Sequence, residues 1–594
     1  MSPLRRPPGK ATVVALFAAV VLVGALVHAV AALAPFAADD YLHRAMLHGA
    51  YGWPRSAADL YTFIRDEPAE HRALLDAGVI AWWSDPHLKL VMARPLSSLL
   101  VAVDAWIFGA DVRAAHLHSL AWFVLWAGAA AALYRRMLGT AFGALALLFL
   151  LADDAASSPL GWIANRCVLV SAAAATMAIR SYLALWARPH RRRALALLAW
   201  ICVALAAGEY AVPVLAAIPA HALTARRDGS RRRTLTLAAS ALVVVAYALA
   251  RRAWGAGVHG CDIYADSWRD APRVAALVPA LAFRVGADLV AGASVDLPVP
   301  WWMVRWPVLS TATMLAGAVS AVVVVRTLDP RRRRIFRWAL LWCAAALAPA
   351  LTSWLTGRLM LAPAMAASVA LSLVVQACRQ RWKAGPRAWV PGAFAVLVVV
   401  VHGPLAALQT LVVEVRKSSI ARSDARAASS LLTNAPLGAA DRVVVVNGMD
   451  AETMFFGRFT RIGEGLEVPA HWNVLASTPT AVRLERVSER AVDVAEAQGV
   501  LRGLAAPWFR SGLDTFRVGD HVATEGMDVD VLETAAGRPT RVRFTFARAL
   551  EDPTYLFTIA LPDGLHRVSL PAVGASVTVP FALVLGRSGE AMER

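Results

Sequence analysis

The sequence predicts a polytopic α-helical membrane protein with about eleven transmembrane helices, followed by a soluble C-terminal domain of α+β or β-rich fold. Hydrophobic residues make up 58% of the 594 residues and charged residues 17%, whereas soluble domains are typically about 45–50% apolar and about 25% charged. Apolar runs of membrane length recur up to residue 413. Beyond about residue 418 the apolar runs shorten and charges of both signs mix.

The charge balance is strongly basic, with 60 Lys and Arg against 42 Asp and Glu and a net charge of +18. In a soluble protein this balance would suggest a nucleic-acid partner. Here the basic residues lie in short runs between apolar stretches, which is typical of loops held on the cytoplasmic side of a membrane. The sequence therefore predicts the lipid bilayer as a partner and no nucleic acid.

The first apolar run covers residues 11–35 and follows Arg5, Arg6 and Lys10. This charge order resembles a signal peptide, but the run is too long for one. At about 1.5 Å per residue it can cross a hydrocarbon core of about 30 Å. We therefore expect an uncleaved first helix.

Eleven apolar runs bounded by charge are candidate spans. They cover residues 11–35, 115–134, 138–152, 162–185, 193–208, 210–225, 234–251, 306–326, 335–352, 358–377 and 388–413. Arginine-rich runs lie in alternate loops, at 135–136, 188–193, 226–233, 331–334 and 379–383. Because short cytoplasmic loops retain positive charge, this alternation predicts a cytoplasmic N-terminus and an extracytoplasmic C-terminal domain.

Residues 272–293 form a further apolar run, but this run carries Arg284 and Asp288. Counting it as a span would move the run at 331–334 to the outer side. We therefore expect an interfacial or re-entrant helix at 272–293.

The predicted domains are 1–413, which includes a long outer loop at 36–113, and 414–594. Long loops in compact domains usually carry function. Trp82 and Trp83 in this loop favour an aromatic belt at the membrane interface over stacking on a sugar. In the C-terminal domain, β-like stretches lie at 442–446, 541–546 and 568–581, and Pro-Asp-Gly at 562–564 is a hairpin-type turn signal.

Three acidic residues could carry chemistry. Asp39 and Asp40 follow the first span at the outer water boundary, where they either mark a helix end or provide a general base or metal ligand. Glu209 lies near the top of two apolar helices, where a carboxylate is costly unless it is hydrated or partnered. His43 lies four residues after Asp39, but no third ligand follows at a fixed spacing, which favours a structural histidine over a metal ligand.

The order of several motifs resembles the GT-C membrane glycosyltransferases, which include protein O-mannosyltransferases and lipid A aminoarabinose transferases. The acidic pair and the outer loop are followed by Ala-Arg-Pro-Leu at 93–96, Trp-Ile-Phe-Gly at 106–109 and His-Leu-His-Ser-Leu at 116–120. Further along are Ala-Asp-Asp at 152–154, Gly-Trp-Ile-Ala-Asn-Arg at 161–166, Gly-Glu-Tyr-Ala-Val-Pro at 208–213 and Gly-Arg-Leu-Met-Leu-Ala-Pro at 357–363. The resemblance covers residues 11–413.

The resemblance implies transfer of a sugar from a polyprenyl-phosphate carrier to a glycan, lipid or protein acceptor outside the bacterial inner membrane. Asp39 or Asp40 would take the acceptor proton, and the other would orient the acceptor. Asp40 would be the residue to hold a divalent cation, Mg²⁺ or Mn²⁺, if one takes part.

Four further residues are candidates for substrate binding: Arg94, Arg166, Glu209 and Arg358. Arg166 and Arg358 would grip the departing lipid phosphate, because the guanidinium group forks onto phosphate oxygens. Snorkelling of either arginine to the lipid headgroups is the alternative.

Two other functions compete with the transferase. A transporter or lipid-linked-sugar flippase would use intramembrane acids as a proton relay and broken helices to hold its substrate. In this sequence the acids gather at the outer boundary instead. A sensing module anchored by the helices is the third possibility, but eleven spans exceed what an anchor needs.

The charge alternation makes a prediction about topology. A reporter fused at Ser230 should show cytoplasmic activity and one fused at Gly519 extracytoplasmic activity, because the arginine runs hold their loops inside. Paired alkaline phosphatase and fluorescent protein fusions measure this. Cytoplasmic activity at Gly519 would contradict the predicted orientation.

Overall fold

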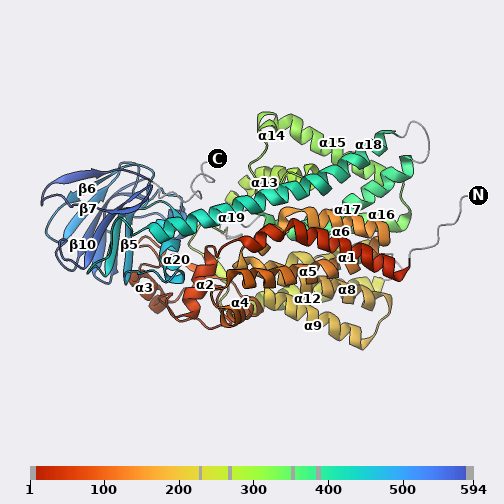
Figure 1. The fold of residues 1–594 in the computed structure, drawn as a ribbon, viewed down its shortest axis with the longest axis horizontal. Coiled ribbons are helices and arrows are strands. Elements are labelled where there is room, and N and C mark those ends of the chain that lie inside the picture. The colour runs from red at the N-terminus through yellow and green to blue at the C-terminus, as the bar shows by residue number, and fades with distance from the viewer. Residues whose placement is uncertain (1–8, 226–229, 265–270, 349–354, 383–388, 583–594) are drawn as a thin grey trace, which may run out of the picture. The chain divides into compact units, whose positions relative to one another are not determined.

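The computed structural model describes residues 9–225, 230–264, 271–348, 355–382 and 389–582 (Figure 1). The chain forms two compact units. The first consists of Met1–Ala34, Ala93–Ala253 and Ser267–Ser418, and the second of Pro35–Met92, Trp254–Asp266 and Ser419–Arg594. The boundaries differ from the predicted linear division at residue 413, because most of the outer loop and a short later segment pack with the C-terminal part of the chain.

The first unit is helical. Its helices are α1 (Lys10–Val27), α4 (Pro95–Phe108), α5 (Val112–Leu138), α6 (Thr140–Ala152), α7 (Ser157–Gly161), α8 (Arg166–Ala187), α9 (Arg191–Ala207), α10 (Ala211–Leu215), α11 (Ala217–Thr224), α12 (Ser230–Ala253), α13 (Ala271–Ala291), α14 (Trp301–Arg305), α15 (Pro307–Val325), α16 (Pro330–Ala346), α17 (Gly357–Trp382) and α18 (Trp389–Val400). Helix α19 (Ala406–Ser430) begins in this unit and ends in the second. Helices occupy the described part of all eleven predicted spans.

Among the described residues, seven helices are long and apolar enough to cross a membrane, or eight if the bent pair α6 and α7 is one span. Helix α13, at the predicted non-spanning run, is not among them. The three other predicted spans are shorter: α9 and α16 have 17 residues each, and α10 and α11 divide one run between them. Seventeen residues is near the lower limit for crossing a bilayer.

The arginine runs gather at one end of the helical unit. Arg136, near the end of α5, donates to the Leu183 carbonyl near the end of α8, and Arg232, at the start of α12, donates to the Trp186 carbonyl. Val13, near the start of α1, lines the same groove as Arg135. This end is therefore also the one at which α1 begins. Arg5, Arg6, Arg226, Arg227, Lys383 and residues 349–352 of the predicted runs lie outside the described residues.

Small residues bring the helices close together, as is common where lipid provides no hydrophobic drive for association. A Cβ atom at Gly24 of α1 would lie 2.7 Å from the Leu151 Cβ atom of α6. Tyr134 of α5 donates its hydroxyl to the Met365 carbonyl of α17 at 2.7 Å. The bundle is thus packed through backbone approach and a few buried hydrogen bonds.

The second unit contains all the strands that the structure describes, with helices α2 (Asp39–Leu47), α3 (Pro68–Asp76) and α20 (Gly457–Gly463). The strands are β1 (Thr62–Ile64), β2 (Lys89–Val91), β3 (Gly257–His259), β4 (Arg442–Asn447), β5 (His471–Ala476), β6 (Val482–Arg486), β7 (Ala491–Ala495), β8 (His521–Thr524), β9 (Met527–Ala535), β10 (Arg538–Phe546), β11 (Tyr555–Leu561), β12 (Gly564–Arg567) and β13 (Ser576–Val579). They form sheets in the orders β1-β2-β3, β13-β6-β7-β10-β9-β8 and β12-β11-β4-β5.

The strand patterns follow from burial. All six residues of β4 are buried, as expected of a strand that pairs in parallel on both sides with β5 and β11. Strand β10 alternates buried and more exposed positions along its second half and pairs in antiparallel fashion with β7 and β9. The predicted β-rich C-terminal domain is confirmed.

The structure also corrects some local predictions. The stretch 568–581 contains only the short strand β13, whereas the predicted hairpin is present, with Leu561 of β11 opposite Gly564 of β12. Trp82 and Trp83 are not in an aromatic belt, because both are buried in the second unit. Their indole nitrogens donate to backbone carbonyls of that unit.

Candidate active site

An ion pair between Arg94 and Glu209 forms the centre of the candidate site. Arg94 precedes Pro95 at the start of α4, and Glu209 lies in the turn between α9 and α10. The guanidinium contacts both carboxylate oxygens, with the Arg94 Nε to Glu209 Oε2 distance at 3.1 Å. Arg94 is buried and Glu209 is partly accessible. Two-point contacts of this kind hold both side chains in one orientation.

Gly208 makes this approach possible. Its φ is +152°, which L side chains rarely adopt, and a Cβ atom there would lie 3.3 Å from the Arg94 Cγ atom. Burial alone would raise the pKa of the Glu209 carboxyl, but the Arg94 charge, the Arg94 hydrogen bonds and the Arg251 charge lower it to about 2. Glu209 is therefore an anion at neutral pH.

Arg251, near the end of α12, is the functional candidate that the sequence interpretation missed. Its Nη1 atom lies 3.5 Å from Glu209 Oε2 and 3.4 Å from the Tyr247 hydroxyl. One signal in the sequence could have identified it. Arg251 and Arg252 lie at the end of α12 opposite the run Arg231–Arg233, and thus depart from the alternation of charge that the other runs follow.

Tyr210 joins Arg358 to this cluster. The Arg94 guanidinium carbon lies 5.1 Å from the centre of the Tyr210 ring. The charges of Arg358 and Arg94 both act on the Tyr210 phenol. Arg358, at the start of α17, donates to the Asn165 side-chain oxygen at 2.7 Å and lies over the Trp162 ring. Arg94, Glu209 and Arg251 thus form one group of ion pairs, and Arg358 is joined to it only through the action of its charge on Tyr210; these four residues are called the cluster below.

The Arg166 side chain has other partners, although Arg358 contacts Asn165 and Arg94 contacts Cys167 on either side of it. It is 2% exposed and donates to Ser119 Oγ and to the Ala115 carbonyl, both at 2.8 Å, and it pairs with Asp104. Asp104 also contacts His118 at 2.6 Å. With these partners, Arg166 joins α8 to α4 and α5.

Asp39 and Asp40 begin α2 in the second unit. Asp40 is buried, and its Oδ2 atom accepts from the Ala37 amide at 3.0 Å, so this carboxylate stabilises the turn before the helix. Asp39 is the more accessible of the two. Ala38, the residue directly before Asp39, has a φ of +43°, which is a strained value for a residue with a Cβ atom. His43 is buried between the rings of Tyr61 and Phe63, as expected of a structural histidine.

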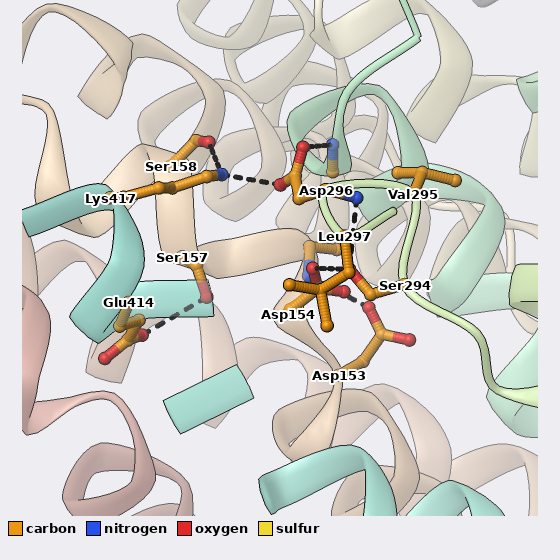
Figure 2. A network of polar contacts seen from close by, with 12 residues as sticks. Asp153, Asp154, Ser157, Ser158, Ser294, Val295, Asp296, Leu297, Glu414 and Lys417 are labelled. Carbon is orange, nitrogen blue, oxygen red and sulfur yellow. Dashed lines mark hydrogen bonds and ion pairs between the residues drawn. The ribbon is translucent and has the colours of Figure 1, made fainter. Parts of the chain in front are cut away.

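A second polar network lies inside the helical unit (Figure 2). Figure 2 shows Lys417 of α19 between Ser158 and Asp296, and the Lys417 Nζ to Asp296 Oδ2 distance is 2.5 Å. Asp296 also accepts from the Gly357 amide at 3.1 Å, one residue before Arg358. Ser294 donates to Asp154 at 2.5 Å. The network thus fixes the start of α17, from which Arg358 projects.

The divalent cation expected at Asp40 stays a prediction. Within the described part of the chain, no group of three or more His, Cys, Asp or Glu side chains is placed to hold a metal ion. Asp40 is also occupied with the Ala37 amide. We therefore assign no step to a metal ion.

Two solved structures are similar to this chain. ArnT from Cupriavidus metallidurans bound to undecaprenyl phosphate is 15% identical, with a TM-score of 0.41, over 79% of this chain and 90% of that one. The same protein in the apo state is 15% identical, with a TM-score of 0.36, over 74% of this chain and 82% of that one. No protein-family model and no curated protein matches the chain.

The lowered pKa of Glu209 predicts how stability depends on pH. A carboxylate whose folded pKa is about 2 and whose ordinary pKa is 4.5 stabilises the fold above pH 4.5, and this contribution is lost as the pH falls through about 2. The wild type should therefore have a higher melting temperature than Glu209→Gln at pH 7, and the difference between the two melting temperatures should narrow below pH 4.5. Melting in non-ionic detergent measures this, with the exposed Glu533→Gln as control. A difference that is unchanged at pH 2.5 would contradict the assignment.

Proposed function

We propose that this protein is a membrane glycosyltransferase that transfers a sugar from a polyprenyl-phosphate donor to an acceptor outside the bacterial inner membrane. The observation that carries the proposal is the cluster of Arg94, Glu209, Arg251 and Arg358 in the helical unit. The cluster lies at the end of α12 opposite its arginine run. If the arginine runs are cytoplasmic, the cluster faces the extracytoplasmic side.

The charge of the cluster suits a phosphate that gains charge during the reaction. Three arginines and one glutamate give a net charge of +2. A polyprenyl-phosphate sugar is a phosphodiester with one negative charge, and the carrier leaves as a monoester with a charge of about −1.5 to −2. Preorganised cations stabilise this additional charge most strongly in the transition state. Glu209 keeps the arginines from repelling one another before the donor binds.

The arginines of the cluster have different roles in this proposal. Arg94 uses Nε and Nη2 on Glu209 and is buried, so it positions Glu209. Arg251 and Arg358 are each partly accessible, and they are the proposed ligands of the donor phosphate. The bond between the sugar C1 atom and the phosphate oxygen breaks with its electron pair on the phosphate. The acceptor oxygen forms the new bond to C1.

The acceptor proton needs a base, and Asp39 is the proposed one. Asp40 holds the Ala37 amide and is buried, whereas Asp39 is more accessible. The choice of Asp39 over Asp40 is part of this proposal. The donor sugar and the kind of acceptor, whether glycan, lipid or protein, are left to experiment.

A transporter or lipid-linked-sugar flippase is the alternative. The observation that favours it is the network of Asp154, Asp296 and Lys417, because charged groups inside a helical unit are typical of proton relays. The two functions differ in products. A transferase releases polyprenyl phosphate from the donor, whereas a flippase moves the donor intact.

The assignment of the base makes a prediction. Purified Asp39→Asn protein should release polyprenyl phosphate from polyprenyl-phosphate sugars about 10²–10⁴-fold more slowly than the wild type, because it lacks the general base. Mass spectrometry of the released carrier, in the presence of a cell-envelope extract as acceptor, measures the rate. Asp40→Asn should lose thermal stability as well. Wild-type turnover in both variants would exclude the acidic pair, and donor movement without release in the wild type would favour the flippase.

The phosphate ligands make another prediction. Arg251→Gln should weaken donor binding, and Arg251→Lys should restore it only in part, because an ammonium group lacks the planar two-point contact. Arg252→Gln is the matched control, because Arg252 is the exposed neighbour of Arg251 and its substitution removes the same charge. Donor affinity in detergent measures this, with melting temperature alongside. Equal losses in the Arg251 and Arg252 variants would show a general effect of surface charge.

A further inference from the structure

A pocket with a volume of about 210 Å³ lies at the arginine-run end of the helical unit. Three arginines line it: Arg136 near the end of α5, and Arg331 and Arg334 on the first turns of α16. Leu183 of α8 and His221 of α11 complete its wall. The pocket therefore lies where three helices end and one begins, at the opposite end of the unit from the candidate active site.

Among the described residues that line the pocket, three are arginines and none is acidic; the nearby Asp329 carboxylate accepts from the Arg331 backbone amide at 2.9 Å. Within the described part of the chain, Arg136, Arg331 and Arg334 have no carboxylate at ion-pair distance, whereas the neighbouring Arg332 pairs with Asp329 at 3.4 Å. Arg180 and Arg193 add positive potential at Arg136. Like charges held together repel one another, and an anion bound between these guanidinium groups would offset that repulsion.

The wall of the pocket is held rigidly. Arg136 donates from Nη2 to the Leu183 carbonyl at 2.6 Å, and this bond directs the rest of the guanidinium. Trp338 donates from its indole nitrogen to the Ala217 carbonyl at 2.8 Å, and its ring packs at 4.9 Å from the ring of His221. A wall of aromatic rings with cations at its mouth offers apolar contact beside a charged site.

We propose that this pocket binds the phosphate of an anionic phospholipid headgroup in the leaflet on the arginine-run side. The phosphate would lie between Arg136, Arg331 and Arg334, and the glycerol backbone against the apolar wall. The volume is below the roughly 300–1,000 Å³ of sites for drug-sized ligands, and it suits a headgroup. Basic pockets between transmembrane helices are a recognised kind of anionic-lipid site. This proposal does not depend on the proposed transferase activity.

The test is native mass spectrometry of the full-length protein in detergent, titrated separately with phosphatidylglycerol, phosphatidylcholine, glycerol 3-phosphate and inorganic phosphate. Arg331→Gln and Arg334→Gln should each weaken phosphatidylglycerol binding about fivefold, the effect of about one surface cation. Arg333→Gln is the matched control, because Arg333 is exposed in the same run and does not line the pocket. Melting temperatures of all variants show whether each is folded, and Arg334→Lys should recover part of the binding.

Each outcome decides the proposal. Selective weakening in the Arg331 and Arg334 variants, with phosphatidylglycerol preferred over phosphatidylcholine, supports a headgroup site. An equal loss in Arg333→Gln would show that general surface charge binds the lipid and would overturn it. Soluble phosphates that bind as tightly as phosphatidylglycerol would identify a free anion as the ligand and would also overturn the lipid assignment.

Discussion

The two-point ion pair between Arg94 and Glu209 is the interaction on which the candidate site depends. An unpaired buried cation is costly, and removing one partner of a buried pair typically destabilises a protein by about 3–5 kcal/mol. Glu209 therefore has to lie where Arg94 is, and Gly208 provides the backbone conformation that allows it. Once Glu209 is fixed, its Oε2 atom contacts both Arg94 and Arg251, so one anion holds an arginine before α4 and an arginine of α12.

The arginines of the helical unit have different roles, and the burial of each side chain decides which role it has. Arg166 is buried and meets several acceptors, so it joins helices. Arg251 and Arg358 keep part of their surface accessible beside fixed partners, which is what a phosphate ligand needs. Arg331 and Arg334 have no carboxylate partner among the described residues. Net charge and residue type alone do not separate these cases, because each depends on which acceptor atoms lie within about 3 Å of the guanidinium nitrogens.

Several features could be predicted from the sequence because they depend on local periodicity. Runs of apolar residues bounded by charge placed the helices, and the change in composition near residue 418 placed the β-rich part. Trp82 and Trp83 were misplaced because an aromatic pair in a loop has the same local pattern at a membrane interface and in a soluble core. Arg251 was missed because an arginine at a helix end also fits snorkelling.

The sequence by itself determined the class of protein, the positions of the helices and the candidate acids and cations, because hydrophobic length and charge are properties of short segments. Only the tertiary structure decided which candidates lie together. In that structure Glu209 contacts both Arg94 and Arg251, and Arg166 forms an ion pair with Asp104. The chain also divides into two units that are each made of distant segments. The physical reason is that ion pairing and desolvation depend on distances between residues far apart in the chain, and no local pattern encodes those distances.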